Sequence, residues 1–215
     1  MTHCSKCNSR YIVEGTCSKC GKDPLYHVTD RPEFQKWPSI ARLSREIICS
    51  EKIDGSNSSI CVTEQGNVYA GSRTRWITPE DDNFGFARWV KEHEIGLAAE
   101  LGVGLHYGEW WGKGIQRGYG LQEKRFSLFN TTRWKNEVLT FCHVVPVLYE
   151  GLFDTVKIDE VLEELRTSGS HATFPRYPKP EGIVIFHIKA NQMFKKTLDH
   201  NDLHKGSTQP LDPRA

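Results

Sequence analysis

The sequence has no long apolar run, no excess of one charge and no repeated or low-complexity tract. No window approaches the roughly 18 consecutive apolar residues that a membrane-spanning helix requires, so no such helix is expected. The 28 basic and 27 acidic residues nearly cancel, which excludes a globally basic protein that coats nucleic acid. A polyanionic partner would therefore have to bind at a local basic patch.

The N-terminal residues Met1–Lys6 lack an apolar segment, so a secretory signal is not expected. The 215 residues are 38% hydrophobic, 11% aromatic and 26% charged, which is the mixture of a globular protein. This length suits one medium domain with or without a small appendage, and it allows a substantial hydrophobic core. We expect a monomer that does not bind membranes.

Four of the seven cysteines form two Cys-x2-Cys pairs near the N-terminus: Cys4 with Cys7, and Cys17 with Cys20. Four thiolates suit a tetrahedral zinc ion and leave no position for a substrate. Two disulfides or a thiol redox pair would need an oxidising compartment or a thioredoxin-like context, and the sequence indicates neither. Residues 1–24 are therefore predicted to form a structural zinc knuckle. The other cysteines stand among apolar neighbours and are predicted to be buried thiols: Cys49, Cys61 and Cys142.

Residues 25–205 read as one α+β domain with mainly antiparallel sheets, because strands come in runs and helices are interspersed irregularly. Residues 206–215 are predicted to be a mobile tail. Helical periodicity is present around residues 86–93 and over 158–165, the second helix ending before Gly169. The predicted strands are residues 47–53, 58–63, 68–70, 105–111, 125–129 and 183–188, the last of them central in its sheet.

The chemistry is expected around Lys52, which stands at a predicted strand end just before the turn Asp54-Gly55-Ser56-Asn57. Such a lysine can be presented to a pocket rather than to bulk water. A lysine amine attacks only when it is neutral, so desolvation or neighbouring cations must lower its pKa. Alone, the motif is weak, because a lysine before a turn is usually a solvated surface residue.

Six segments in order strengthen this interpretation. They are Lys52-Ile-Asp-Gly, Gly71-Ser-Arg-Thr-Arg, Tyr107-Gly-Glu-Trp-Trp-Gly, Phe126-Ser-Leu-Phe-Asn, Pro180-Glu-Gly-Ile-Val-Ile and Phe194-Lys-Lys-Thr. Together they resemble the motifs of the covalent nucleotidyltransferases, the superfamily of ATP-dependent ligases and capping enzymes, over about residues 45–200. Glu51-Lys-Ile-Asp-Gly-Ser-Asn and Gly112-Lys-Gly-Ile-Gln-Arg look most like the phage RNA ligase 2 type.

The resemblance implies an ATP-grasp-like adenylation domain that joins 3′-hydroxyl and 5′-phosphate ends, using ATP and Mg²⁺ or Mn²⁺. Lys52 would be the nucleophile that becomes adenylated. Glu109 would accept a hydrogen bond from the ribose, and Phe129 would stack on adenine. Glu181 would hold the divalent metal. The implied ATP or AMP contacts are Glu51, Lys52, Ile53, Asp54, Asn57, Arg73, Glu109, Phe129, Glu181, Lys195 and Lys196.

Two departures from the family pattern concern these assignments. Asn130 stands where members usually have aspartate. The last motif commonly reads Lys-x-Lys, whereas here Thr197 follows Lys195 and Lys196. Which of the two lysines contacts the phosphate therefore stays open at the level of sequence.

The basic stretch between Lys113 and Lys135 is the predicted nucleic-acid surface, because phosphate binding uses local positive charge. The partner expected from the resemblance is an RNA end, a nicked duplex or an RNA-containing hybrid, in the cytoplasm of a bacterium or a phage-infected host. A small DNA ligase and a zinc-knuckle nucleic-acid-binding protein on an inactive transferase fold are the alternatives. The predicted nucleic-acid contacts are Arg75, Lys113, Arg117, Lys124 and Arg125.

Overall fold

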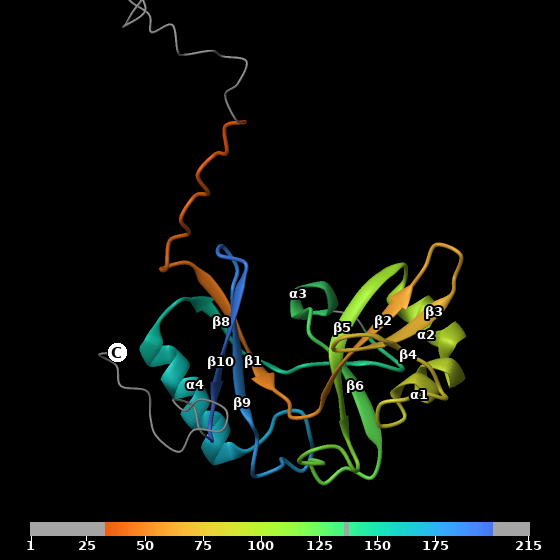
Figure 1. The fold of residues 1–215 in the computed structure, drawn as a ribbon. Helices are drawn as coiled ribbons and strands as arrows, with labels where there is room; N and C mark the ends of the chain where they lie inside the picture. Colours follow the sequence, from red (N-terminus) through yellow and green to blue (C-terminus); the bar gives the residue numbers. More distant parts are fainter. Residues whose placement is uncertain (1–32, 136–137, 200–215) are drawn as a thin grey trace, which may run out of the picture. The chain divides into compact units, whose positions relative to one another are not determined.

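The computed structural model describes residues 33–135 and 138–199. The chain divides into two compact units, Met1–Ile40 and Ala41–Ala215. In the first unit the described residues, 33–40, are exposed and form neither helix nor strand. The second unit contains the helices and strands of the described chain (Figure 1). The predicted zinc ligands Cys4, Cys7, Cys17 and Cys20, and the predicted tail 206–215, lie outside the described residues.

The second unit is built from two sheets and four helices. The strands are β1 (Glu46–Lys52), β2 (Ser56–Val62), β3 (Val68–Ser72), β4 (Trp76–Ile77), β5 (Gly104–Gly112), β6 (Lys124–Leu128), β7 (His143–Val144), β8 (Val147–Leu152), β9 (Gly182–His187) and β10 (Gln192–Thr197). The helices are α1 (Phe86–Glu92), α2 (Glu94–Leu101), α3 (Thr131–Trp134) and α4 (Thr155–Ser168).

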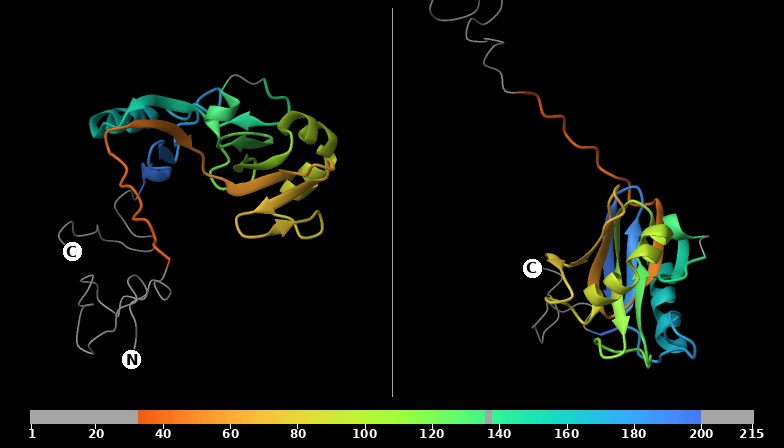
Figure 2. Two further views of the ribbon diagram at one scale, coloured as in Figure 1. Left: turned by 90° about the horizontal axis from the view of Figure 1, so that it is seen from above. Right: turned by 90° about the vertical axis from the view of Figure 1, so that its right-hand side faces the viewer.

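The smaller sheet has the strand order β10-β9-β1-β8 and is antiparallel throughout. Ile47 and Cys49 of β1 alternate onto one face, where they pack with Leu165 of α4. The helix starts at Asp154, whose carboxylate accepts hydrogen bonds from two backbone N–H groups of the first turn, and it ends at Gly169. Figure 2 shows α4 beside this sheet in two further views. One face of β1 is thus covered, and the alternate residues, including Lys52, point the other way.

The larger sheet has the order β4-β3-β2-β5-β6-β7, in which only the β6–β7 pair is parallel among the described strands. Its covered face carries Ile60, Trp110 and Phe126, which pack in one core with Phe86 of α1 and Leu97 of α2. Gly108 of β5 also lies on this covered face, because a Cβ built on it would lie 2.6 Å from the Phe126 ring. Tyr107 and Glu109, on either side of that glycine, therefore face away from the helices.

The chain crosses from one sheet to the other between β1 and β2. The turn predicted at Asp54-Gly55-Ser56-Asn57 does not close a hairpin, because the two strands belong to different sheets. Gly55 is required at this crossing, since a Cβ there would lie 2.5 Å from the Trp110 carbonyl oxygen. Ile53, Trp111 and Tyr119 form a small separate core beside it.

The predicted strands are all present, with ends that differ by at most two residues, and residues 183–188 correspond to the interior strand β9. The helix predicted at 158–165 is α4, and its end before Gly169 is confirmed. Short or edge elements were not predicted: α2, α3, β4, β7, β8 and β10. Cys49 and Cys142 are buried free thiols as predicted, whereas Cys61 is only half-buried.

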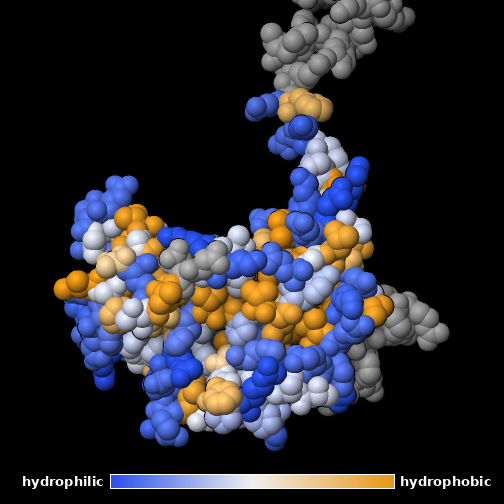
Figure 3. All heavy atoms as spheres, turned by 180° about the vertical axis from the view of Figure 1, so that it is seen from behind, coloured by the Kyte–Doolittle hydropathy of each residue, from blue (hydrophilic) through white to orange (hydrophobic). Residues whose placement is uncertain are grey.

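No helix among the described residues is long and apolar enough to cross a membrane. The surface is not uniformly polar. Figure 3 shows apolar residues gathered in a band across the face opposite to that of Figure 1, between charged residues.

Candidate active site

A pocket of about 880 Å³ collects side chains from both sheets and from the segments that connect them. Lys52 lines it from β1, Asn57 from β2, Glu109 from β5 and Lys195 from β10. The full lining is Lys52, Asp54, Gly55, Ser56, Asn57, Ser72, Arg73, Arg75, Ile77, Asp82, Asn83, Glu109, Gln116, Arg117, Glu181, Lys195, Thr197 and Asp199. The structure therefore brings together residues from five of the six segments that carry the resemblance.

Lys52, the expected nucleophile, faces this pocket and not open solvent. Its Nζ donates to both carboxylate oxygens of Glu181 at 2.7 Å, and the two side chains are 26% and 18% exposed. The register explains the contact, because Lys52 at the end of β1 pairs with Gly182, the first residue of β9. Glu181, the expected metal ligand, is thereby held against the amine.

Glu109 is 5% exposed and accepts two hydrogen bonds. The Gly55 N–H donates to its Oε1 at 3.1 Å, and Asn57 Nδ2 donates to its Oε2 at 3.0 Å. Burial raises the pKa of this carboxyl to about 7. The charge of Lys52 opposes that rise, and nearby Glu181 adds to it. The Glu109 carboxyl thus titrates near neutral pH beside the candidate nucleophile.

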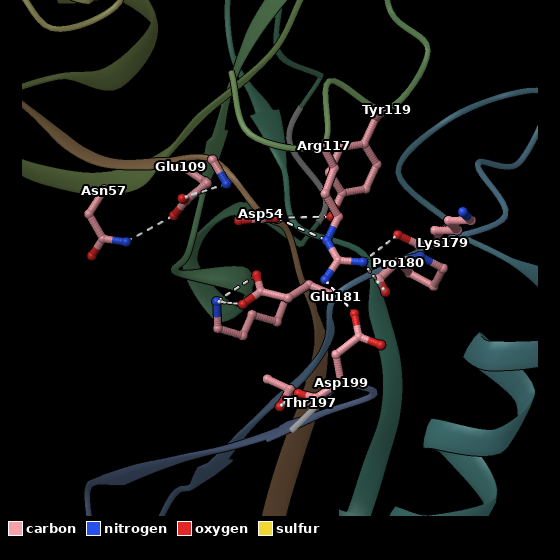
Figure 4. A network of polar contacts seen from close by, with 12 residues as sticks. Asp54, Asn57, Glu109, Arg117, Tyr119, Lys179, Pro180, Glu181, Thr197 and Asp199 are labelled. Carbon is pink, nitrogen blue, oxygen red and sulfur yellow. Dashed lines mark hydrogen bonds and ion pairs between the residues drawn. The ribbon is translucent and has the colours of Figure 1, made fainter. Parts of the chain in front are cut away.

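Arg117 connects the segments that surround the pocket (Figure 4). Its Nε donates to Asp54 in the β1–β2 crossing at 2.9 Å, and its second terminal nitrogen donates to Asp199 after β10 at 2.9 Å. The other terminal nitrogen donates to the carbonyl oxygens of Lys179 and Pro180 just before β9. One guanidinium therefore fixes three chain segments that are distant in sequence.

Tyr119, in the segment between β5 and β6, also contacts Asp54. Its buried hydroxyl oxygen accepts the Asp54 N–H at 2.9 Å, and burial is the main cause that raises the pKa of this phenol. Asp54 is consequently held at both its backbone, by Tyr119, and its side chain, by Arg117.

Strand register answers which lysine of the last motif faces the pocket. Lys195 pairs with Val184 and lines the pocket, whereas Lys196 pairs with Ile183, on the face covered by α4. Lys196 forms an ion pair with Asp159 of that helix. Thr197, two residues beyond Lys195, again lines the pocket.

Four of the residues implied as nucleotide contacts do not line the pocket: Glu51, Ile53, Phe129 and Lys196. Glu51 neighbours Lys52 on β1 and so points to the opposite face, where its carboxylate accepts the backbone N–H groups of His171 and Ala172. Burial raises the pKa of Glu51 against these hydrogen bonds. The Glu51 side chain is thus bonded to the 170–172 segment and does not line the pocket.

The Ile53 side chain packs against Trp111 in the small core and does not line the pocket. Phe129 lies just after β6 and is 39% exposed. Its N–H donates to the Tyr107 carbonyl oxygen, which puts it on the same sheet face as Glu109 although outside the pocket lining. Asn130, the departure from the family, accepts the Arg133 N–H and begins α3.

The predicted basic surface is largely engaged within the chain. Arg117 pairs with two aspartates, Arg125 pairs with Glu123, and the Lys124 amine donates to the Phe84 carbonyl oxygen. Arg75 forms a two-pronged ion pair with Asp81 although it lines the pocket. Of the five predicted contacts, Lys113 and Lys124 have no ion pair within the described chain. Three of the five predicted contacts therefore have carboxylate partners that sequence spacing does not indicate, and binding of nucleic acid at this surface stays a prediction.

Several lining residues were missed from sequence. Asp82 accepts hydrogen bonds from backbone N–H groups at the start of α1, and Asn83 donates to the Ser56 hydroxyl. The Asp-Asp-Asn run before a helical segment is a capping signal that could have indicated the first contact. Asp199 has no local signal, since its partner Arg117 is 82 residues away in sequence.

The family follows from comparison with known proteins. A model of the RNA ligase family matches residues 45–198, which is most of the chain. The chain belongs to the RNA ligase family. The expected membership of the RNA ligases and the expected mixed α+β fold are thereby confirmed at the level of the family.

Solved structures agree on the fold. The chain resembles a Naegleria gruberi RNA ligase mutant with ATP and Mn (20% identity, TM-score 0.53, 73% of this chain, 51% of that one). It also resembles the Naegleria gruberi RNA ligase with PPi (19% identity, TM-score 0.52, 72% and 50%). It thus spans about half the length of these structures. No curated protein matches the chain.

Proposed function

We propose that this family member is an ATP-dependent RNA ligase that works through a lysyl-AMP intermediate on Lys52, in the manner of the RNA ligase 2 type. The observation that carries the proposal is the placement of the Lys52 amine inside a pocket, against Glu181 and near the buried Glu109. In the first step the Lys52 nitrogen attacks the α-phosphorus of ATP. A P–N bond forms, and the bond to the leaving pyrophosphate breaks.

The next steps transfer the nucleotide to the nucleic acid. A 5′-phosphate oxygen attacks the lysyl-AMP phosphorus and releases the amine, and a 3′-hydroxyl then attacks the activated 5′-phosphate and releases AMP. The residues suited to these anionic steps are Lys195 and Arg73, which line the pocket and have no ion pair within the described residues. Glu109 suits a hydrogen bond with a ribose hydroxyl.

A divalent ion, Mg²⁺ or Mn²⁺, is part of the proposal, since the reacting phosphates carry dense negative charge. Glu181 supplies a hard carboxylate oxygen of the kind such ions bind, with Asp54 and Asp199 farther along the pocket wall. The described residues contain no cluster of three or more ligating side chains that could hold an ion alone. This donor set fits Mg²⁺, which is often held by one or two carboxylates plus substrate phosphates and water.

Other expectations stay proposals. Residues 1–24 are proposed to bind Zn²⁺ through Cys4, Cys7, Cys17 and Cys20, and residues 25–205 to form the adenylation domain. RNA ends are the proposed partner, with a monomer acting in the cytoplasm. A small DNA ligase is the competing function, and nicked duplexes whose 3′-hydroxyl strand ends in ribose or deoxyribose would distinguish the two.

The test of the first step is a mass measurement after incubation with ATP and Mg²⁺ and denaturation. We expect an AMP adduct on Lys52 that pyrophosphate reverses and that Lys52→Ala abolishes. Lys157→Ala, which removes an exposed lysine paired with Glu160 on α4, is the matched control and should keep the adduct. A wild-type protein that stays unmodified with Mg²⁺ and with Mn²⁺ would favour a binding protein on an inactive fold.

A further inference from the structure

An exposed row of aromatic side chains crosses the larger sheet outside the pocket. Trp76 of β4 is 56% exposed, and Tyr107 of β5 is 59% exposed. The register joins them in one line, because Trp76 pairs with Gly71, Gly71 with Ser59, and Ser59 with Tyr107. Residues paired directly across antiparallel strands project from the same face.

This row lies on the sheet face away from the helices. A Cβ on Gly71 would lie 3.3 Å from the Trp76 ring and 2.5 Å from the Ser59 hydroxyl, so the indole covers the glycine. Tyr69, two residues before Gly71 and 50% exposed, places its ring centroid 6.2 Å from that of Trp76. The intervening Ala70 belongs to the core under α1 and α2.

The row is continuous with the candidate active site. Ser72, at the end of β3, and Arg73 and Arg75, in the turn before β4, line the pocket. At the other end, the Phe129 N–H is bonded to the Tyr107 carbonyl oxygen, so the aromatic row continues to the residue that the family resemblance assigns to adenine. A ligand that follows the row therefore reaches the pocket.

The dimensions and chemistry of the row match unpaired bases. Neighbouring strands are about 4.8 Å apart, so the three steps from β4 to β5 span about 14 Å, a length of a few nucleotides. Only Gly71 and the buried Ser59 stand between Trp76 and Tyr107 in this line, so no aliphatic side chain separates the two exposed rings. Aromatic rings on an open sheet face stack bases, and adjacent arginines contact phosphates.

We propose that Trp76, Tyr69 and Tyr107 form a platform that stacks the unpaired bases of a nucleic-acid strand leading to the pocket. This inference rests on the proposed ligase function for the orientation of the strand.

The experiment measures binding of a fluorescein-labelled single-stranded oligoribonucleotide by anisotropy over a series of salt concentrations. Trp76→Ala and Tyr107→Ala should each weaken binding about tenfold, whereas Trp76→Phe and Tyr107→Phe should retain most of the affinity. The slope of affinity against salt should not change, because stacking releases no counterions. Phe174→Ala removes an aromatic side chain that is 99% exposed, in the segment before β9, and should bind as the wild type does.

Unlabelled duplex RNA and single-stranded RNA of the same length then compete for the protein. The single strand should compete better, since paired bases cannot stack on the rings. Equal competition, or unchanged affinity in both alanine variants, would overturn the platform and leave the exposed rings as a protein-docking surface. The AMP adduct is measured on the same wild-type preparation. If the adduct is absent while the alanine variants still bind the oligoribonucleotide more weakly, the ligase proposal is rejected and the stacking platform is supported.

Discussion

Glu109→Gln is expected to stabilise the folded protein above pH 7. Burial raises the pKa of the Glu109 carboxyl from 4.5 to about 7, so between these values the folded state keeps a proton that the unfolded state has lost. The stability associated with that proton is fully present below pH 4.5 and is lost as the pH rises through 7. Glutamine is neutral throughout, so the variant does not show this decline.

The size of the effect follows from the two pKa values. A rise from 4.5 to about 7 corresponds to about 3 kcal/mol as an upper value. The side-chain amide can still accept the Gly55 N–H, and the Asn57 amide can turn over to accept from it. Allowing for weaker hydrogen bonds in the neutral pair, the variant should gain about 1–3 kcal/mol relative to wild type between pH 5 and pH 8.

Urea denaturation at several pH values, without ATP and metal, measures this difference. Glu64→Gln removes an exposed carboxylate on the β2–β3 turn and is the matched control, with no comparable pH dependence expected. A difference between Glu109→Gln and wild type that is constant with pH, or that favours wild type at pH 8, would refute the reasoning. The same variant should form less AMP adduct, because a charged acceptor for the ribose is lost.

Three further predictions follow from the geometry. Lys195→Ala should reduce adduct formation at least tenfold, whereas Lys196→Ala should change it less than twofold, because Lys196 pairs with Asp159 on the α4 face; equal losses in a mass assay would contradict the register. Arg117→Lys keeps the charge but not the forked contacts, and should lower the free energy of unfolding by about 1–2 kcal/mol and reduce adduct formation, both recorded on one preparation. Gly55→Ala should lower the free energy of unfolding by about 1–3 kcal/mol in urea titrations, since the added methyl meets the Trp110 carbonyl oxygen; a wild-type value would mean that the crossing can relax.

The elements with strong local signals were predictable, and those without were not. The apolar run of β9 and the amphipathic α4 were visible in the sequence, whereas β8 and β10 have mixed, largely exposed residues and form only by pairing with β1 and β9. The motif residues Lys52, Glu109 and Glu181 meet as the resemblance implied.

The sequence did not show which face of its strand each site residue occupies. Adjacent residues on a strand point to opposite sides, so Glu51 and Lys52 separate, as do Lys195 and Lys196, although each pair reads as one motif. The ion pairs of Arg117 depend on chain segments that meet only in three dimensions. For that reason charge counting along the chain did not show which basic side chains already have carboxylate partners within the fold.

The charge balance of the pocket gives a physical reason for the divalent ion. Five basic residues (Lys52, Arg73, Arg75, Arg117, Lys195) and five acidic residues (Asp54, Asp82, Glu109, Glu181, Asp199) line it. Three of the cations already pair with carboxylates, which leaves Arg73 and Lys195 as the lining cations without an ion pair in the described chain. Two lining carboxylates without an ion pair in the described chain, Asp82 and Glu109, offset these two cations, so the pocket has little net charge to balance the roughly four negative charges of a nucleoside triphosphate. A divalent ion held by Glu181 would supply part of that balance in the proposed reaction. By withdrawing Glu181 from the Lys52 amine, it would also remove the partner that holds the nucleophile in place.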